Sequence, residues 1–160
     1  MRIVVANKLH VAEMCELLNE VIAQGGTTAL SHTISSDEMQ GWMSRNYQSS
    51  AWHVAENSKG SVLGFQWIEP ADYLPSDAAE IATFAKVGKT GLGIGSALFE
   101  ATKRAAVLLG YRWINANIRS DNVGGLAYYQ SRGFEDYGTK IGVRMANGQI
   151  VDKVLKRYDL

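Results

Sequence analysis

A glycine-rich stretch at residues 88–96, GKTGLGIGS, runs directly into the helical pattern ALFEATKRAAVLLG. Gly91, Gly93 and Gly95 fall within five residues of one another. Glycine lets the backbone come close to a ligand, and a helix N-terminus presents free N–H groups at its positive dipole end. The pattern therefore favours a phosphate site, and the candidate ligands are ATP, a dinucleotide and coenzyme A.

The spacing around the last glycine excludes two of these ligands. A P-loop places a lysine directly after its last glycine, whereas Gly95 is followed by Ser96 and Ala97. A dinucleotide fingerprint reads G-x-G-x-x-G after a first strand, whereas GLGIGS reads G-x-G-x-G and lies in mid-chain. Coenzyme A is the ligand that remains.

Hydrophobic periodicity predicts the elements that must position this segment. A capping box from Ser35 to Glu38 predicts a helix start, and Asn147-Gly148 predicts a hairpin with a type I′ turn. On the helix after the glycines, the expected buried positions are Ile94, Leu98, Ala101, Ala105 and Leu108. We expect strands at 2–6, 51–56, 61–69, 79–87, 111–118, 134–145 and 149–158, and helices at 10–24, 36–43, 94–109 and 123–132. The order βααβββαβαββ predicts one mixed α/β domain over residues 1–160.

Composition narrows the function classes. Sixteen basic residues balance sixteen acidic ones among 160, so no overall field favours nucleic acid or an anionic membrane. The single cysteine, Cys15, lies in the apolar rhythm of the first helix, which predicts a buried core thiol and no internal disulfide. His10, His32 and His53 lack metal-ligand spacing, so we expect no metal. The chain has no long apolar run and no signal-peptide core, and we expect a soluble, cytoplasmic protein.

Two motifs resemble those of one enzyme superfamily. TGLGIGSALFEA is similar to the Q/R-x-x-G-x-G/A pyrophosphate loop of the GNAT N-acetyltransferases. DNVGGLAYYQSRGFEDYG is similar to their N-x-x-A/G-x-x-x-Y-x-x-x-G-F segment through Asn122, Gly125, Tyr129, Gly133 and Phe134. The stretches GTTALSHTISSDEMQGWM and AEIATFAKVGKTGLGIG most resemble the phosphinothricin and L-amino-acid N-acetyltransferase branch. The resemblance covers nearly the whole chain and implies a GNAT-like twisted sheet of six to seven strands.

The resemblance implies acetyl-CoA as co-substrate. Thr90 stands where the superfamily has Gln or Arg, and we expect Lys89 to replace part of that contact, with Lys86, Lys103 and Arg104 nearby. Gly124 and Gly125 cost a helix roughly 1 kcal/mol each relative to alanine, so we expect them to give a cofactor room. The implied cofactor-binding residues are Ala85, Lys86, Val87, Lys89, Thr90, Gly91, Gly93, Gly95, Ser96, Asn122 and Gly125.

Acyl transfer to an amine needs a base and an acid. A lysine-like amine has a pKa of about 10.4 and must lose a proton to attack, and the departing thiolate must gain one. The resemblance implies Glu80 as the base, acting through water, and Tyr129 as the acid. We expect Glu80, Ala82, Phe84 and Lys86 to share one face of their strand.

The acceptor site is less defined by the sequence. The resemblance places the loop with Thr27, Thr28 and His32 at its border, and Tyr73 is a further candidate, although core packing is the better expectation for Trp42, Trp67 and Tyr73. The loop PADYLPSDAAE has no Arg where the resembling branch places one to hold a substrate carboxylate.

We predict an N-acetyltransferase that acts on a primary amine of a small molecule, an amino acid or an analogue, and that forms a homodimer as the resemblance implies. The alternatives are an acetyltransferase for protein N-termini or lysines, and a non-catalytic acyl-CoA-binding module. A binding module would need neither Glu80 nor Tyr129.

Overall fold

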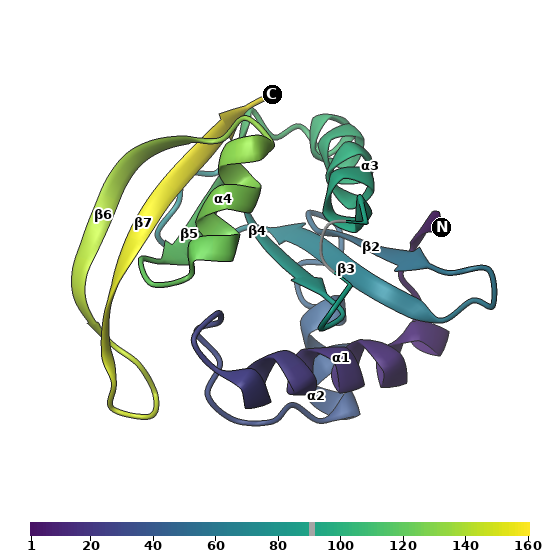
Figure 1. Ribbon diagram of the computed structural model, residues 1–160. Coiled ribbons are helices and arrows are strands. Elements are labelled where there is room, and N and C mark those ends of the chain that lie inside the picture. The colour runs from purple at the N-terminus through teal and green to yellow at the C-terminus, as the bar shows by residue number, and fades with distance from the viewer. Residues whose placement is uncertain (90–91) are drawn as a thin grey trace.

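The computed structural model describes residues 1–89 and 92–160, and its elements follow the predicted order (Figure 1). A short 3-10 turn, η1 (Lys8–His10), precedes the first helix. The helices are α1 (Val11–Gln24), α2 (Ser36–Ser44), α3 (Ile94–Leu108) and α4 (Val123–Ser131). The strands are β1 (Arg2–Val5), β2 (Ala51–Glu56), β3 (Val62–Glu69), β4 (Ala78–Ala85), β5 (Trp113–Arg119), β6 (Glu135–Arg144) and β7 (Ile150–Asp159).

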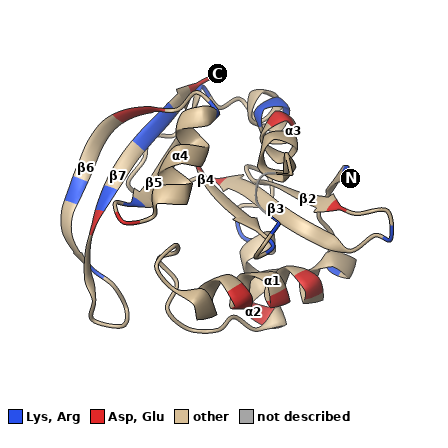
Figure 2. Ribbon diagram, viewed as in Figure 1, with Lys and Arg blue, Asp and Glu red and all other residues tan. Residues whose placement is uncertain are grey.

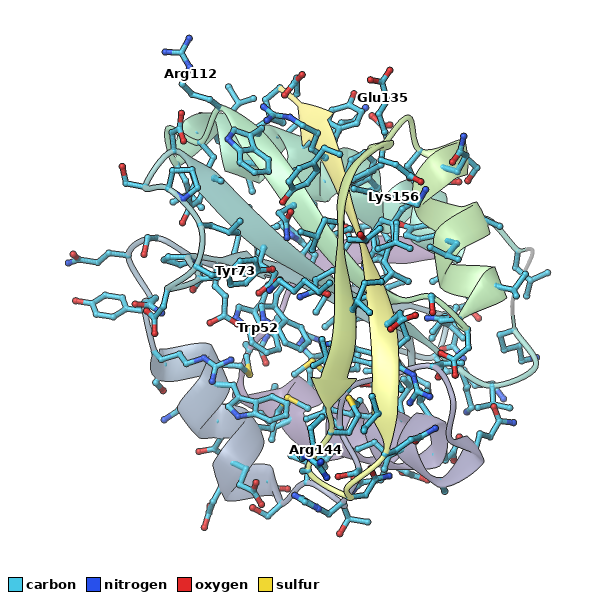
Figure 3. The ribbon with its side chains drawn as sticks, turned by 90° about the vertical axis from the view of Figure 1, so that its left-hand side faces the viewer. Trp52, Tyr73, Arg112, Glu135, Arg144 and Lys156 are labelled. Carbon is cyan, nitrogen blue, oxygen red and sulfur yellow. The ribbon has the colours of Figure 1, made fainter. Side chains whose placement is uncertain are left out.

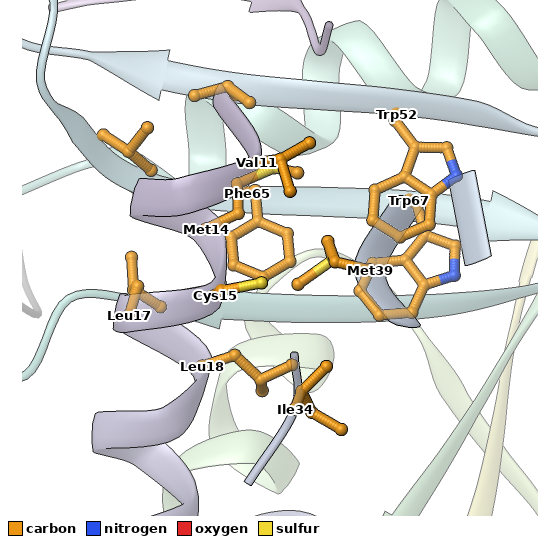
Figure 4. Packing of buried hydrophobic residues seen from close by; sticks show 12 residues of the cluster. Val11, Met14, Cys15, Leu17, Leu18, Ile34, Met39, Trp52, Phe65 and Trp67 are labelled. Atoms are coloured by element: carbon orange, nitrogen blue, oxygen red, sulfur yellow. The ribbon is translucent and has the colours of Figure 1, made fainter. Parts of the chain in front are cut away.

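The seven strands form one mixed sheet with helices on both faces, in the order β1-β2-β3-β4-β5-β7-β6. Helices α1 and α2 lie on one face, and α3 and α4 lie on the other (Figure 1). Successive strand residues point to opposite faces, so Phe65 and Trp67 pack toward α1 whereas Gln66 and Ile68 point toward α3. Cys15 lies buried in the α1 cluster, as predicted (Figure 4).

The sheet opens between its two central strands. Strands β4 and β5 are a parallel pair, and their ladder runs from Ala78↔Trp113 to Glu80↔Asn115. Strand β4 continues to Ala85 and β5 to Arg119, but the ladder does not follow them. Beyond Glu80, the edge of β4 that faces β5 is therefore available to another hydrogen-bonding partner.

Local sequence signals define the helix ends as predicted. Ser35 and Glu38 form the reciprocal hydrogen bonds of a capping box at α2. Gly25 ends α1 with a φ of 72°, and Gly133 follows α4 with a φ of 99°, both in the region that favours glycine.

Two local predictions are wrong. The β6–β7 hairpin turns at Asn147-Gly148, but a type I′ turn needs positive φ at both central residues. Here Gly148 has a φ of 85° and Asn147 has no positive φ, and Gly148 N–H donates to the Met145 carbonyl. In this turn Gly148 follows the two central residues and forms a bulge. Leu108 is 88% exposed because, at 3.6 residues per turn, it lies opposite the buried Ala106 of α3.

Candidate active site

An open cavity of about 1170 Å³ brings together most of the residues that the sequence singled out. Of those in the described part of the chain, His32 and Tyr73 do not line it. Thr90 and Gly91 lie outside the described residues. The predicted site residues that line the cavity are Thr27, Thr28, Glu80, Ala85, Lys86, Val87, Lys89, Gly93, Gly95, Ser96, Asn122, Gly125 and Tyr129.

One end of the cavity is the N-terminus of α3. Gly93 is the N-cap residue, with a φ of 77°, and its carbonyl accepts the first helical bond from Ala97 N–H at 3.0 Å. Among the described residues no side chain caps this helix, so the N–H groups of its first turn face the cavity as donors. Lys86 and Lys89 line the same end, where they add positive charge.

The remaining predicted cations are placed elsewhere. Lys103 pairs with Glu100 at 2.8 Å, and neither Lys103 nor Arg104 lines the cavity. Gly95 has a packing reason to be glycine, because a Cβ there would lie 2.5 Å from Cε1 of Tyr128. Its missing side chain makes room for an aromatic ring as well as exposing backbone.

The start of α4 forms a second wall. Asn122 Oδ1 accepts from Gly125 N–H at 2.9 Å and caps the helix, while Asn122 Nδ2 donates to the Thr27 carbonyl at 3.0 Å. A Cβ at Gly125 would lie 2.5 Å from Nδ2, so this glycine accommodates the capping side chain. Gly124 has more open space and also lines the cavity.

Tyr129 approaches the cavity from the α3–α4 face of the sheet. It is 7% exposed, and its hydroxyl lies 2.8 Å from Oγ1 of Thr83. Burial raises the pKa of Tyr129 above its ordinary value, so the phenol keeps its proton at neutral pH.

Glu80 lies on β4 and approaches the cavity from the α1–α2 face of the sheet. It lies directly opposite Glu69 of β3, and Ala82 and Phe84 share its face, as predicted, whereas Lys86 lies beyond the end of β4. Burial raises the pKa of Glu80, partly offset by a hydrogen bond that its carboxylate accepts from Tyr73. A carboxyl with a raised pKa is a stronger base than an exposed one once it is ionised.

Tyr73 is not a core residue. The residue is 44% exposed. The centre of its ring lies 3.8 Å from Nζ of Lys140, which belongs to β6, and Figure 3 shows Tyr73 beside this strand. Asn115 Nδ2 donates to the Tyr73 hydroxyl at 2.9 Å. Tyr73 therefore holds the Glu80 carboxylate from outside the cavity, whereas Trp42 and Trp67 both pack in the core cluster and line the cavity.

Several lining residues carry no signal in the sequence because they lie on strands far from the motifs. Lys153 on β7 lines the cavity beside Arg119 on β5, and burial lowers the pKa of Lys153. Arg119 is buried, pairs with Asp121 at 2.8 Å and donates to the Thr28 carbonyl at 3.3 Å. Arg45, which follows α2, and Glu69 on β3 form an ion pair at 2.8 Å, and both line the cavity. Figure 2 shows cationic residues along β6 and β7 and acidic residues on α1 and α2.

Neither a metal site nor a membrane-spanning helix is found in the part of the chain that the structure describes. No group of three or more His, Cys, Asp or Glu side chains is placed to hold a metal ion in residues 1–89 and 92–160. In the same residues, every helix is too short or too polar to cross a bilayer.

Comparisons with known proteins agree on one family. The model of the acetyltransferase (GNAT) family matches residues 15–134. A relative from Bacillus subtilis (strain 168), named "Putative phosphinothricin acetyltransferase YwnH", is 28% identical over 148 residues, 90% of this chain and 85% of its own length.

Solved structures share the whole fold. A ribosomal-protein-alanine N-acetyltransferase from Brucella melitensis superposes with a TM-score of 0.90 at 21% identity over 100% of both chains. A GNAT superfamily phosphinothricin acetyltransferase from Sinorhizobium meliloti, in complex with AcCoA, gives 0.86 at 20% identity over 99% of this chain and 88% of its own. Because the family model covers most of the chain, the chain belongs to the acetyltransferase (GNAT) family and is an N-acetyltransferase.

Proposed function

We propose that this enzyme transfers the acetyl group of acetyl-CoA to a primary amine of a small molecule, an amino acid or an analogue. The observation that carries the proposal is the placement of Glu80 and Tyr129. They reach one cavity from opposite faces of β4, and the N-terminus of α3 opens into the same cavity. A base, an acid and a phosphate site are thus arranged around one space.

The described residues fit coenzyme A. Uncapped N–H groups at the start of α3 suit a pyrophosphate, and Lys86 and Lys89 supply counter-charge. The unpaired edge of β4 between Ile81 and Ala85 suits the amides of a pantetheine arm, which can add to a strand as a peptide does. When bound, acetyl-CoA supplies the activated acetyl group.

Glu80 and Tyr129 handle the protons of the transfer. Glu80, directly or through water, accepts the proton that the amine loses as its nitrogen bonds to the acetyl carbon. Tyr129 gives its proton to the sulfur as the carbon–sulfur bond breaks, and the phenolate regains a proton from solvent. Glu80 returns its proton to solvent, which balances the proton that Tyr129 regains, so a neutral amine and the thioester give an amide and a thiol.

The acceptor end supports a small zwitterionic substrate. Contacts from Asn122 to the Thr27 carbonyl and from Arg119 to the Thr28 carbonyl fasten the 27–28 segment onto α4 and β5. The fastened segment lines the cavity, which favours a small acceptor over a long peptide. Lys153, partly buried in the cavity wall, is placed to attract a carboxylate that accompanies the amine.

A substrate panel tests the proposal. Purified enzyme with acetyl-CoA is offered amino acids, the matching decarboxylated amines and short peptides, and thiol release is followed. We expect release with one or more amino acids and a weaker response to their decarboxylated partners. Lys153→Met should reduce that preference without changing acetyl-CoA binding. Release with peptides alone would favour a protein acetyltransferase, and acetyl-CoA binding without release for any amine would favour a binding module.

A homodimer stays a prediction. Strand β6 is an edge of the sheet, and Ile141 and Ile150 on the β6–β7 hairpin are 75% and 60% exposed. Exposed apolar side chains on an edge hairpin suit a subunit contact. Analytical ultracentrifugation would show whether the mass is that of two chains.

A further inference from the structure

A buried row of hydroxyl and amide groups joins Tyr129 to α3. Gln66 is fully buried at the middle of β3, and Thr83 lies directly opposite it on β4, on the same face of the sheet. Gln66 Nε2 lies 2.9 Å from Thr83 Oγ1 and 3.0 Å from the Tyr128 hydroxyl, and its Oε1 lies 2.5 Å from Thr102 Oγ1. Thr83 Oγ1 in turn lies 2.8 Å from the Tyr129 hydroxyl.

The direction of every bond in this row follows from one carbonyl. The Gly95 carbonyl can only accept, so the Tyr128 hydroxyl, 2.7 Å away, donates its proton to it. The Tyr128 oxygen must then accept from Gln66, which identifies the nearby Gln66 atom as the amide nitrogen. The second proton of that nitrogen goes to Thr83 Oγ1.

Thr83 Oγ1 accepts from Gln66, and its own proton has the Tyr128 and Tyr129 oxygens as neighbours. Because the Tyr128 oxygen already accepts from Gln66, the Thr83 proton is assigned to the Tyr129 oxygen, 2.8 Å away. The phenol proton of Tyr129 is then directed away from Thr83, and Tyr129 lines the cavity.

We propose that Gln66 and Thr83 are positioning residues that direct the Tyr129 proton into the cavity and stabilise the phenolate left after that proton is given up. The proposal rests on the proposed role of Tyr129 as the acid. In the transfer, the O–H bond of Tyr129 breaks as an S–H bond forms. The negative charge then rests on the Tyr129 oxygen, where the Thr83 hydroxyl already donates.

This support has a physical reason. An ordinary phenol has a pKa near 10 and an ordinary thiol one near 8.5, so a tyrosine is the weaker acid of the two. Burial raises the pKa of Tyr129 further, and its titratable neighbours Tyr128 and Glu80 act in the same direction. The hydrogen bond from Thr83 acts against all three. Without that donor, the buried phenol would be a poor source of a proton.

A double-mutant cycle tests the proposal. Thr83→Val removes the hydroxyl at nearly constant shape, and we expect kcat to fall about 10- to 100-fold with little change in the KM for acetyl-CoA. Thr83→Ser, which keeps the hydroxyl, should recover most of the rate. In the Tyr129→Phe background, Thr83→Val should have no further effect on kcat, because its partner oxygen is gone. Gln66→Leu is a second probe and should also lower kcat.

Thr102→Val compares the two ends of the row. It removes a buried hydrogen bond to the oxygen of the same glutamine, so stability should fall, and kcat should fall less than in Thr83→Val, which loses the donor to Tyr129 itself. An equal loss from Thr83→Val in the wild-type and Tyr129→Phe backgrounds would overturn the proposal. So would an unchanged kcat in Thr83→Val while Tyr129→Phe is impaired. An unchanged kcat in Tyr129→Phe itself would instead overturn the acid role of Tyr129.

A binding measurement gives a readout that does not depend on turnover. The thiol pKa of bound coenzyme A is followed by the ultraviolet absorbance of its thiolate, in wild type and in Thr83→Val. A directed Tyr129 proton stabilises the thiolate, so the bound thiol pKa should be higher in Thr83→Val, by about one unit. Identical values in the two proteins would contradict the proposal.

Discussion

The two faces of β4 bound the cavity in different ways. On the α3–α4 face, the wall includes the backbone N–H groups at the start of α3 with Lys86 and Lys89 beside them, the buried and uncharged Tyr129, and the hydrogen-bonded row behind it. On the α1–α2 face, the wall carries charges, among them Glu80, Glu69 and Lys153. One face suits a ligand recognised through its phosphates and amides, whereas the other suits a small charged acceptor. Changes on the first face should affect every acceptor alike, and changes on the second should depend on the acceptor.

Of the changes considered, removing the Tyr129 hydroxyl should give the largest fall in kcat. Tyr129→Phe should lower kcat by about 10²- to 10⁴-fold, the range for loss of a general acid, for every acceptor tested. The ring remains, so calorimetry should find nearly unchanged acetyl-CoA affinity. A loss that varied strongly from one acceptor to another would show that the two faces do not act separately.

Glu80→Gln should come next, with a fall in kcat/KM of about 10²-fold at neutral pH. Glu80 works as a base only when ionised, and burial raises its pKa, so the acidic limb of the wild-type profile should lie above the ordinary glutamate value of about 4.3. The defect should shrink as pH approaches the pKa of the amine, which then arrives neutral. Rate profiles against pH for both proteins measure this.

Glu69→Gln is the matched control for that charge. Glu69 lies opposite Glu80, but Arg45 and the Trp67 indole already hold its carboxylate, at 2.8 and 2.6 Å. The variant should keep the base-dependent form of the pH profile, with its acidic limb at lower pH, because the Glu69 charge is one of the causes that raise the pKa of Glu80. If Glu80→Gln lost the same factor at every pH, Glu80 would position the substrate instead of taking its proton.

Gly93→Val should weaken acetyl-CoA binding by about tenfold or more. A Cβ at Gly93 meets open space, but its φ of 77° is strained for valine, by about 1–3 kcal/mol. The resulting shift of the backbone would displace the N–H groups at the start of α3. Acetyl-CoA should raise wild-type stability by roughly 2.7 kcal/mol at 100 times its Kd, and a thermal shift assay would record the smaller rise in the variant.

Gly110→Val is the control for backbone strain alone. Gly110 has a φ of 89°, meets no atom within 4 Å and lies at the far end of α3, away from the cavity. Both variants should be less stable without ligand. If both lost the acetyl-CoA shift equally, the effect of Gly93 would be general destabilisation.

The same two faces differ in how far the sequence predicts them. The order of elements, the capping box at Ser35 and the start of α3 follow from rules that act within a few residues, and all are confirmed. Gly125 shows the limit of such rules, since its fit to the Asn122 side chain appears only in three dimensions.

The acceptor face depends on contacts across the whole chain. Arg119 reaches Thr28 over 91 positions, and Lys153 comes from a strand that follows every motif. Local spacing in the sequence does not predict that Tyr73 contacts Glu80. The polar Gln66 and Thr83 lie side by side only because of the register between β3 and β4. Such residues are found by pairing strands, which one sequence does not specify.

Asn122 contacts both the start of α4 and the acceptor segment at Thr27. Its variants should give the smallest change in activity, but they separate an effect on stability from an effect on acceptor binding. Its Oδ1 caps α4, and its Nδ2 holds the Thr27 carbonyl. Asn122→Ala loses both contacts and should lower the free energy of unfolding by about 1 kcal/mol. Asn122→Asp keeps a cap that favours the helix dipole but places a carboxylate oxygen against the Thr27 carbonyl. Both variants should raise the acceptor KM about 2- to 10-fold, the usual value of one hydrogen bond, and only the alanine variant should lose stability.

Denaturation curves measure the change in stability, and acceptor titrations measure the change in KM. Acetyl-CoA affinity should stay unchanged in both variants. A loss of acetyl-CoA affinity in Asn122→Asp would instead assign this side chain to the cofactor, as the sequence resemblance implies.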